Sequence, residues 1–215
     1  MSLPMPPQDA PFARASPIIA VVLAGGQGVR MGGGDKGLRL LGGRTLLDHV
    51  LGRVGPQADA VVLNANGDAG RFAGLGLPVV ADGVGAGPLA GVLAGLRWVA
   101  AHHPGAEVLV VPSDTPFLPG DLAARLRAGR GTAALACAAS GGRVHPVVAL
   151  WRVALGDALE ASLRDGERRV VTWMRGQGLA EVAFADGDAG DPFANLNTPE
   201  ELAAAAARLR GMADR

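Results

Sequence analysis

The sequence predicts a doubly wound, Rossmann-like α/β fold, with a mostly parallel sheet as the middle of three α/β/α layers. Two observations lead to this prediction. Short continuous apolar runs alternate with longer segments in which apolar residues recur at helical spacing. The early runs are each followed by a segment rich in glycine, asparagine, aspartate or proline. Because parallel strands need a crossover connection, this alternation indicates parallel pairing with helices on both faces of the sheet.

Four strands and two helices are predicted in the first half of the chain. The strands are the apolar runs at residues 18–23, 60–63, 79–81 and 107–111. A helix from Thr45 ends at Gly55-Pro56, and a second begins at Pro88, a residue that suits a first helical position. Ligands of such sheets bind beyond the carboxyl ends of the strands. The site is therefore expected in the segments that begin at Ala24, Asn64, Asp82 and Pro112.

The second half adds strands at residues 133–139, 147–151 and 181–184 and helices at 154–163 and 170–175. A last helix is marked by Thr198 as its cap, Pro199 in its first turn and Glu201, which completes a capping box. No repeat or clear linker interrupts the pattern, so residues 17–215 are expected to form a single domain. Residues 1–16 hold four prolines and no continuous apolar stretch, and are expected to form a disordered tail.

Composition limits the partners and the compartment. The formal net charge is zero, so no overall field would attract nucleic acid or an anionic membrane surface. No apolar run reaches the roughly 20 residues of a membrane span, and the first residues do not resemble a signal peptide. We therefore expect a cytoplasmic protein. The single cysteine, Cys137, cannot form an internal disulfide, and a buried strand residue is expected there rather than a catalytic thiol.

The glycine-rich segment 23–36 ends at Lys36, the only lysine of the chain, while the other 19 basic residues are arginines. Glycines let backbone N–H groups approach an anion, and a compact ammonium reaches among phosphate oxygens where a planar guanidinium cannot. The segment is no P-loop, because Gly37 follows the lysine, and no dinucleotide fingerprint, whose third glycine falls on Met31. We expect it to hold a phosphate with Arg30 and Lys36. A merely flexible loop and a lysine placed by chance are the alternatives.

Several stretches together resemble the molybdenum cofactor guanylyltransferases (MobA family), in type and in order, from about residue 18 to 209. They are Leu23-Ala24-Gly25-Gly26 with Arg30-Met31-Gly32 and Asp35-Lys36, Asn64-Ala65-Asn66, Gly87-Pro88-Leu89-Ala90-Gly91, Ser113-Asp114-Thr115-Pro116, Gly166-Glu167-Arg168-Arg169-Val170, and Asn195-Leu196-Asn197-Thr198-Pro199-Glu200-Glu201-Leu202. The set is specific, whereas no single member is.

The resemblance implies a nucleotide-diphospho-sugar-transferase-like fold and a Mg²⁺-dependent enzyme. It would transfer GMP from GTP to molybdenum-molybdopterin, releasing pyrophosphate and forming molybdopterin guanine dinucleotide. Chaperones specific to molybdoenzymes, or other proteins of cofactor biosynthesis, would be its partners. The catalytic residues would be Lys36, Arg30 and Asp114. The nucleotide site would comprise Leu23, Ala24, Gly25, Gly26, Lys36, Asn64, Asp82 and Asp114.

Two aspartates follow predicted strands at their carboxyl ends. Asp114 is the best candidate for a metal ligand, because Mg²⁺ prefers one or two carboxylates together with phosphate oxygens of a substrate. Its alternative is a turn or cap before a helix near Asp121. Asp82 can accept two N–H groups from a guanine edge, which cytosine does not offer, and its alternative is a turn residue.

Polar residues of the second half are candidates for molybdopterin binding. Asn195 and Asn197 alternate on an extended stretch and so share a face, where they contact metal or pterin or only order the turn before the last helix. His145, which precedes Pro146, is a weaker candidate. Arginines suit the anionic groups of this substrate, although a solvated helix face is the alternative. These arginines are Arg164, Arg168, Arg169 and Arg175.

Three rival functions differ from this hypothesis in testable ways. A cytidylyltransferase acting on molybdopterin or on a sugar or polyol phosphate would keep the fold and change the base. The stretch Leu23-Ala24-Gly25-Gly26 argues against it, because relatives that use CTP commonly show Leu-Ala-Ala-Gly at this point. A nicotinamide oxidoreductase would leave Lys36 and Asp114 unexplained. A carrier that delivers molybdopterin without catalysis would release no pyrophosphate.

Overall fold

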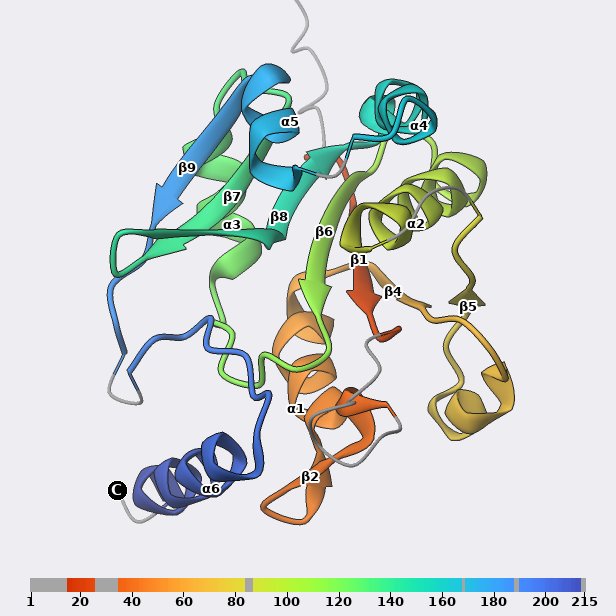
Figure 1. The fold of residues 1–215 in the computed structure, drawn as a ribbon. Helices are drawn as coiled ribbons and strands as arrows, with labels where there is room; N and C mark the ends of the chain where they lie inside the picture. Colours follow the sequence, from red (N-terminus) through yellow and green to blue (C-terminus); the bar gives the residue numbers. More distant parts are fainter. Residues whose placement is uncertain (1–14, 26–34, 84–86, 168, 188–189, 214–215) are drawn as a thin grey trace, which may run out of the picture.

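The computed structural model describes residues 15–25, 35–83, 87–167, 169–187 and 190–213. Within them, seven strands form one sheet in the order β5-β4-β1-β6-β8-β7-β9 (Figure 1). The strands are β1 (Ile18–Leu23), β4 (Ala60–Asn64), β5 (Val79–Val80), β6 (Glu107–Pro112), β7 (Leu135–Ser140), β8 (Arg143–Arg152) and β9 (Leu179–Ala183). Neighbours pair in parallel except at β8, which is antiparallel to β6 and β7. The mostly parallel sheet expected from the sequence is confirmed.

Helices cover both faces of this sheet, because successive residues of a strand point to opposite sides. Ala20 and Val22 of β1 pack in one cluster with α1 (Leu46–Val54) and α3 (Leu122–Arg130). Ile19 and Val21 pack in the other, with α2 (Pro88–His102), α4 (Gly156–Arg164) and α5 (Val170–Gly176). The three α/β/α layers are therefore confirmed, and β1 lies in the middle layer with both faces buried.

The last helix, α6 (Pro199–Ala213), lies apart from the layers, on the side where β1 and β6 end (Figure 1). Its Ala205 packs in a small apolar cluster with Leu41, Leu46, Phe117 and Leu196. The predicted capping box is present: Glu201 N–H donates to Thr198 Oγ1 at 3.2 Å, and Thr198 N–H donates to the Glu201 carboxylate at 3.1 Å. The box fixes the point at which the chain leaves the sheet edge and turns into α6.

Strand β8 is longer than predicted and runs antiparallel to its two neighbours. It begins at Arg143 rather than at residue 147, so that His145 and Pro146 belong to it. Gly141 and Gly142, with φ of 53° and 74°, form the two-residue turn that joins β7 to β8. Such a turn forces antiparallel pairing from its first flanking residues. The sheet is therefore mostly parallel, as predicted, and this hairpin accounts for its antiparallel strand.

Several short elements in the first half of the chain were not predicted. They are the 3-10 helices Lys36–Leu38 and Ala69–Leu75 and the two-stranded hairpin of β2 (Leu40–Leu41) and β3 (Arg44–Thr45). None is long enough to show a periodic apolar pattern. The expected tail lies almost entirely in residues 1–14, outside the described ranges, and stays a prediction. No helix in the described part of the chain is long and apolar enough to cross a lipid bilayer.

Close packing of α2 on β1 depends on Gly95. A Cβ atom at this position would lie 2.6 Å from Cγ1 of Val21, a contact that the buried core cannot relieve without movement. We expect Gly95→Ala to lower the free energy of unfolding by about 1–3 kcal/mol, measured by urea denaturation. Gly52→Ala in the exposed part of α1 is the matched control and should be neutral or slightly stabilising. Equal stability of the two variants would contradict this account of the packing.

Candidate functional site

Three parallel strands in register bring the candidate residues together. Leu23 at the end of β1 pairs with Asn64 of β4 on one side and with Pro112 of β6 on the other. The hydrogen bonds continue past the strand ends, since Ala24 N–H donates to Asn64 O at 2.8 Å and Ser113 N–H donates to Leu23 O at 3.0 Å. The segments after β1, β4 and β6 therefore start side by side, at the sheet edge where the sequence analysis predicts the site.

Lys36 lies directly opposite Asp114 at this edge. Its ammonium is 3.5 Å from Asp114 Oδ2 and donates to Asn197 Oδ1 at 2.6 Å. Gly37 makes this approach possible, because a Cβ atom there would lie 2.9 Å from Oγ of Ser113. The lysine is thus held between the end of β6 and the segment before α6, with its charge directed at the carboxylate.

Asp114 is a buried carboxylate with incomplete hydrogen bonding. Its Oδ1 is buried and accepts no hydrogen bond from the described residues. Burial raises the pKa of Asp114 above its usual value, and the neighbouring Lys36 charge works in the opposite direction. A buried anionic oxygen without a donor is a position that a cation can fill.

The donor set fits a metal that takes most of its ligands from a substrate. The described residues contain no cluster of three or more histidine, cysteine, aspartate or glutamate side chains that could hold a metal alone. Mg²⁺ commonly keeps several waters and binds through one or two carboxylates plus phosphate oxygens. Asp114 Oδ1 would supply the protein ligand for such a cation.

Asp82 is held in a fixed orientation by two asparagines. Asn64 Nδ2 donates to its Oδ1 at 2.6 Å, and Asn66 Nδ2 donates to its Oδ2 at 2.9 Å. Asn66 Oδ1 also accepts from the Asp82 backbone N–H at 2.8 Å. Each carboxylate oxygen therefore keeps a lone pair for a ligand while the group itself cannot rotate freely.

A cavity of about 340 Å³ lies beside this carboxylate. Its shape depends on Gly91, because a Cβ atom there would come within 2.2 Å of Asn64 Oδ1. The start of α2 can thus close over the asparagine and form one wall. The lining residues are Gly25, Asn64, Asn66, Asp82, Gly87, Pro88 and Gly91.

The nucleotide candidates Leu23, Ala24, Gly25, Lys36, Asn64, Asp82 and Asp114 thus meet at one edge of the sheet. Gly26 and Arg30 lie outside the described residues. Asn66 was not singled out as a site residue, although the sequence carries a signal for it. In an extended segment residues two apart share a face, so that Asn64 and Asn66 point the same way.

The molybdopterin candidates are not gathered in one place. Asn197 contacts Lys36, whereas Asn195 Oδ1 accepts from Thr115 Oγ1 at 2.7 Å. The N–H of the intervening Leu196 donates to the backbone oxygen of Asp114 at 3.0 Å. The segment before α6 therefore runs along the residues that follow β6, and it supports the lysine and the aspartate.

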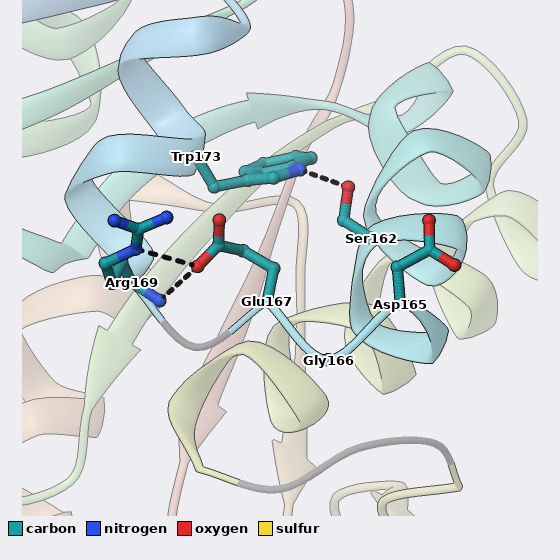
Figure 2. A pocket seen from close by; sticks show the side chains of 6 residues that line it. All are labelled: Ser162, Asp165, Gly166, Glu167, Arg169 and Trp173. Atoms are coloured by element: carbon teal, nitrogen blue, oxygen red, sulfur yellow. Dashed lines mark hydrogen bonds and ion pairs between the residues drawn. The ribbon is translucent and has the colours of Figure 1, made fainter.

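Arg169 lies in a second cavity, of about 470 Å³, lined by Ser162, Asp165, Gly166, Glu167, Arg169 and Trp173. Figure 2 shows the loop between α4 and α5 carrying Glu167 and Arg169 below the indole of Trp173. Glu167 Oε1 accepts from the Arg169 N–H at 2.7 Å and lies 3.5 Å from its Nε. The arginine side chain is 77% exposed, which leaves its outer nitrogens accessible to a ligand. Arg168 lies outside the described residues.

The remaining arginines of the basic group are paired on helix surfaces. Arg164 pairs with Glu160 of the same helix, and Arg175 pairs with Glu181 at 2.8 Å. Both arginine side chains are more than half exposed, as expected for a solvated helix face. Neither lines the second cavity.

His145 is buried in a polar network on β8. Its Nε2 lies 2.8 Å from Ser140 Oγ, which donates to Asp191 Oδ1 at 2.7 Å, and its ring packs 4.9 Å from that of Phe193. Burial lowers the pKa of His145, with a smaller opposing effect from Asp191. These contacts tie the 190–193 segment to the β7–β8 hairpin. His145 lines neither cavity.

Known proteins are similar to this chain over most of its length. A model of the MobA-like NTP transferase domain matches residues 20–181. A molybdenum cofactor guanylyltransferase from Cereibacter sphaeroides is 53% identical over 195 residues, covering 90% of this chain and 97% of the relative. A protein of the same name from Rhodopseudomonas palustris is 53% identical over 207 residues, covering 94% of this chain and 96% of the relative.

Solved structures share the fold at low identity. Molybdopterin-guanine dinucleotide biosynthesis protein A from Archaeoglobus fulgidus matches with a TM-score of 0.70 at 23% identity, covering 90% of this chain and all 100% of the other. The 2-C-methyl-D-erythritol 4-phosphate cytidylyltransferase from Thermus thermophilus matches with a TM-score of 0.65 at 24% identity, covering 88% and 98%. The fold prediction is confirmed. Because a protein named for a guanine dinucleotide and one named a cytidylyltransferase share this fold, the fold alone does not identify the nucleotide.

The buried charge of Asp114 leads to a prediction in which stability and activity diverge. Because its pKa in the folded protein is raised, ionisation of Asp114 removes stability as the pH rises above the unfolded value of about 3.8. Asp114→Asn removes this charge, so the Tm at neutral pH, measured by calorimetry, should be unchanged or higher. The same variant should abolish nucleotidyl transfer, because it lacks the carboxylate. Lys36→Ala should also abolish turnover without unfolding the chain. Near-normal turnover in either variant would contradict the assignment of this pair.

Proposed function

The chain belongs to the MobA-like NTP transferase family, and on this premise we propose that it transfers GMP from GTP to the terminal phosphate of molybdenum-molybdopterin. A phosphate oxygen of molybdopterin forms a bond to the α-phosphorus of GTP, and the bond between that phosphorus and the β-phosphate oxygen breaks. The products are pyrophosphate and molybdopterin guanine dinucleotide. The observation that carries the proposal is the opposition of Lys36 and Asp114 at the same sheet edge as the anchored carboxylate of Asp82.

The proposed chemistry needs positioning and charge neutralisation rather than proton transfer. The attacking phosphate is an anion near neutral pH, so no general base is required. Lys36, held by Asn197 and Asp114, would offset negative charge on the phosphates of the bound nucleotide. Arg30 is proposed to act in the same way, on the sequence pattern alone.

We propose Mg²⁺ as the cation that Asp114 Oδ1 would hold. When bound, it would neutralise phosphate charge and orient the triphosphate. The protein's contribution is a buried carboxylate oxygen that has no competing donor among the described residues. Asp114 Oδ2 meanwhile keeps Lys36 in place, so a single side chain would set the positions of both cations.

Guanine is the base that the proposed nucleotide pocket suits. Asp82 can accept from the ring N–H and the amino group of guanine, which lie side by side, whereas cytosine has no such pair. Two asparagines already hold the carboxylate, so binding would cost little reorganisation. The guanylyltransferase names of the relatives agree with this choice and favour it over a CTP-dependent enzyme.

Molybdopterin binding is proposed for the second cavity and its arginines. Arg169 presents an accessible guanidinium there, and Arg168 is proposed to assist it on the sequence pattern. Asn195, Asn197 and His145 remain candidates for this substrate from the family resemblance alone, since none of them lines the second cavity. Chaperone partners and a cytoplasmic location remain predictions from the family resemblance and the composition.

A parallel assay with GTP and CTP tests the proposed reaction. With molybdopterin and Mg²⁺, the protein should release pyrophosphate from GTP and little or none from CTP. Asp82→Asn should reduce the preference for GTP, because an amide cannot accept both N–H groups. Equal or faster release from CTP would favour the cytidylyltransferase alternative, and no release from either would favour a carrier.

A second prediction separates the two substrates. Arg169→Ala should raise the KM for molybdopterin about tenfold or more, since a hydrogen bond to a charged group contributes about 1.5–3 kcal/mol. The KM for GTP should change little. Arg164→Ala, an exposed arginine outside the cavity, is the matched control and should leave both values unchanged. An unchanged KM for molybdopterin in Arg169→Ala would exclude this residue from the acceptor site.

A further inference from the structure

One guanidinium, that of Arg71, connects the two halves of the proposed GTP site. Arg71 lies in the 3-10 helix Ala69–Leu75, and its Nε donates to the carboxylate of Asp35. Its outer nitrogens donate to the backbone oxygen of Asn66, at 2.7 Å, and to that of Asp68. The side chains of Arg71 and Asp35 are only 23% and 17% exposed. The contact is therefore partly shielded from water, unlike a typical surface ion pair.

The partners of Arg71 are adjacent in sequence to groups with separate tasks. Asp35 directly precedes Lys36 and is the N-cap residue of the short helix Lys36–Leu38. Asn66 makes two of the three hydrogen bonds that orient Asp82. The segment that carries Lys36 and the segment that carries Asn66 are thus both bound by the guanidinium of Arg71.

We propose that Arg71 is a positioning residue that couples base recognition to the placement of Lys36. The inference rests on the proposed function, because it assumes that Asp82 binds guanine and that Lys36 acts on the phosphates. Arg71 does not itself line the base cavity. It acts through Asn66 on one side and through Asp35 on the other.

Arginine suits this role better than lysine. Its planar fork directs several N–H donors at fixed angles, which allows simultaneous contact with a carboxylate and with two backbone oxygens. A lysine would keep the positive charge but not the shared geometry. Replacement by lysine therefore separates the effect of charge from the effect of positioning.

The test uses the full chain with Arg71→Ala, Arg71→Lys and Asp35→Ala. The control is Arg53→Ala, since Arg53 is an exposed arginine of α1. Two quantities are measured: kcat for pyrophosphate release from GTP with molybdopterin, and the ratio of the Kd values for ITP and GTP with Mg²⁺. ITP lacks the amino group of guanine, so the ratio reports how well Asp82 recognises the base. Being a ratio, it does not depend on the fraction of protein that is active.

We expect Arg71→Ala to lower kcat by about 10- to 100-fold, the range that a small misplacement of a catalytic group produces, and to reduce the ITP/GTP ratio. In Arg71→Lys, both kcat and the ITP/GTP ratio should remain below the values of the unmodified protein. Asp35→Ala should lower kcat while largely keeping the ratio, because it removes only the contact on the lysine side. Arg53→Ala should match the unmodified protein in both.

Two results would overturn the inference. One is an unchanged ITP/GTP ratio in Arg71→Ala, with any loss of kcat matched by loss of folded protein, which would indicate a purely structural role. The other is full restoration by Arg71→Lys. If Arg71→Ala does not fold, Arg71→Lys and Asp35→Ala still test the proposal. If the unmodified protein binds GTP in preference to ITP but releases no pyrophosphate, the proposed reaction fails, while the binding ratio still tests the link from Arg71 to the base.

Discussion

The parallel register of β4, β1 and β6 is the constraint on which the site depends. Because β1 is hydrogen-bonded on both sides, the segments that follow these three strands must start next to one another. The backbone bonds beyond Leu23 continue this pairing and leave the residues after it little freedom. The site is thus built from chain segments far apart in sequence, and its precision comes from a rigid sheet rather than from the loops themselves.

Electrostatics divide the site into regions with different tasks. Asp114 is buried, and one of its oxygens has no donor among the residues that the structure describes, whereas Asp82 has a donor on each oxygen. The first carboxylate is therefore prepared for a cation, and the second is prepared to accept further hydrogen bonds. This difference follows from the neighbours of each group, since both residues are aspartates that follow a strand. The stability lost by burying an ionised Asp114 is typical of a functional group that the fold alone would not favour.

Most of the fold could be predicted from the sequence because its signals are local. The apolar runs of β1, β4 and β6 and the capping box at Thr198 depend on residues close together in the chain. The predicted positions of Asp82 and Asp114 also followed from local rules, since both come directly after strands. The start of β8 was predicted too late, because Arg143, His145 and Pro146 interrupt the apolar run on which the prediction relied.

The contacts between distant segments could not be predicted from pattern alone. Nothing in the sequence around Asn197 indicates that its amide accepts from Lys36, 161 positions away. The same holds for Arg71, whose partner Asp35 lies 36 positions earlier. Such contacts are decided by how α6 and the 3-10 helix Ala69–Leu75 dock, a property of the folded chain as a whole.

The solitary lysine has a practical consequence. A reagent that modifies primary amines has only one side chain in this sequence to react with, besides the amino terminus, and that side chain is at the centre of the site. The nineteen arginines are not acylated under the same conditions. Lys36 is therefore a natural position for a side-chain label that follows events at the sheet edge, with no need to introduce a new residue.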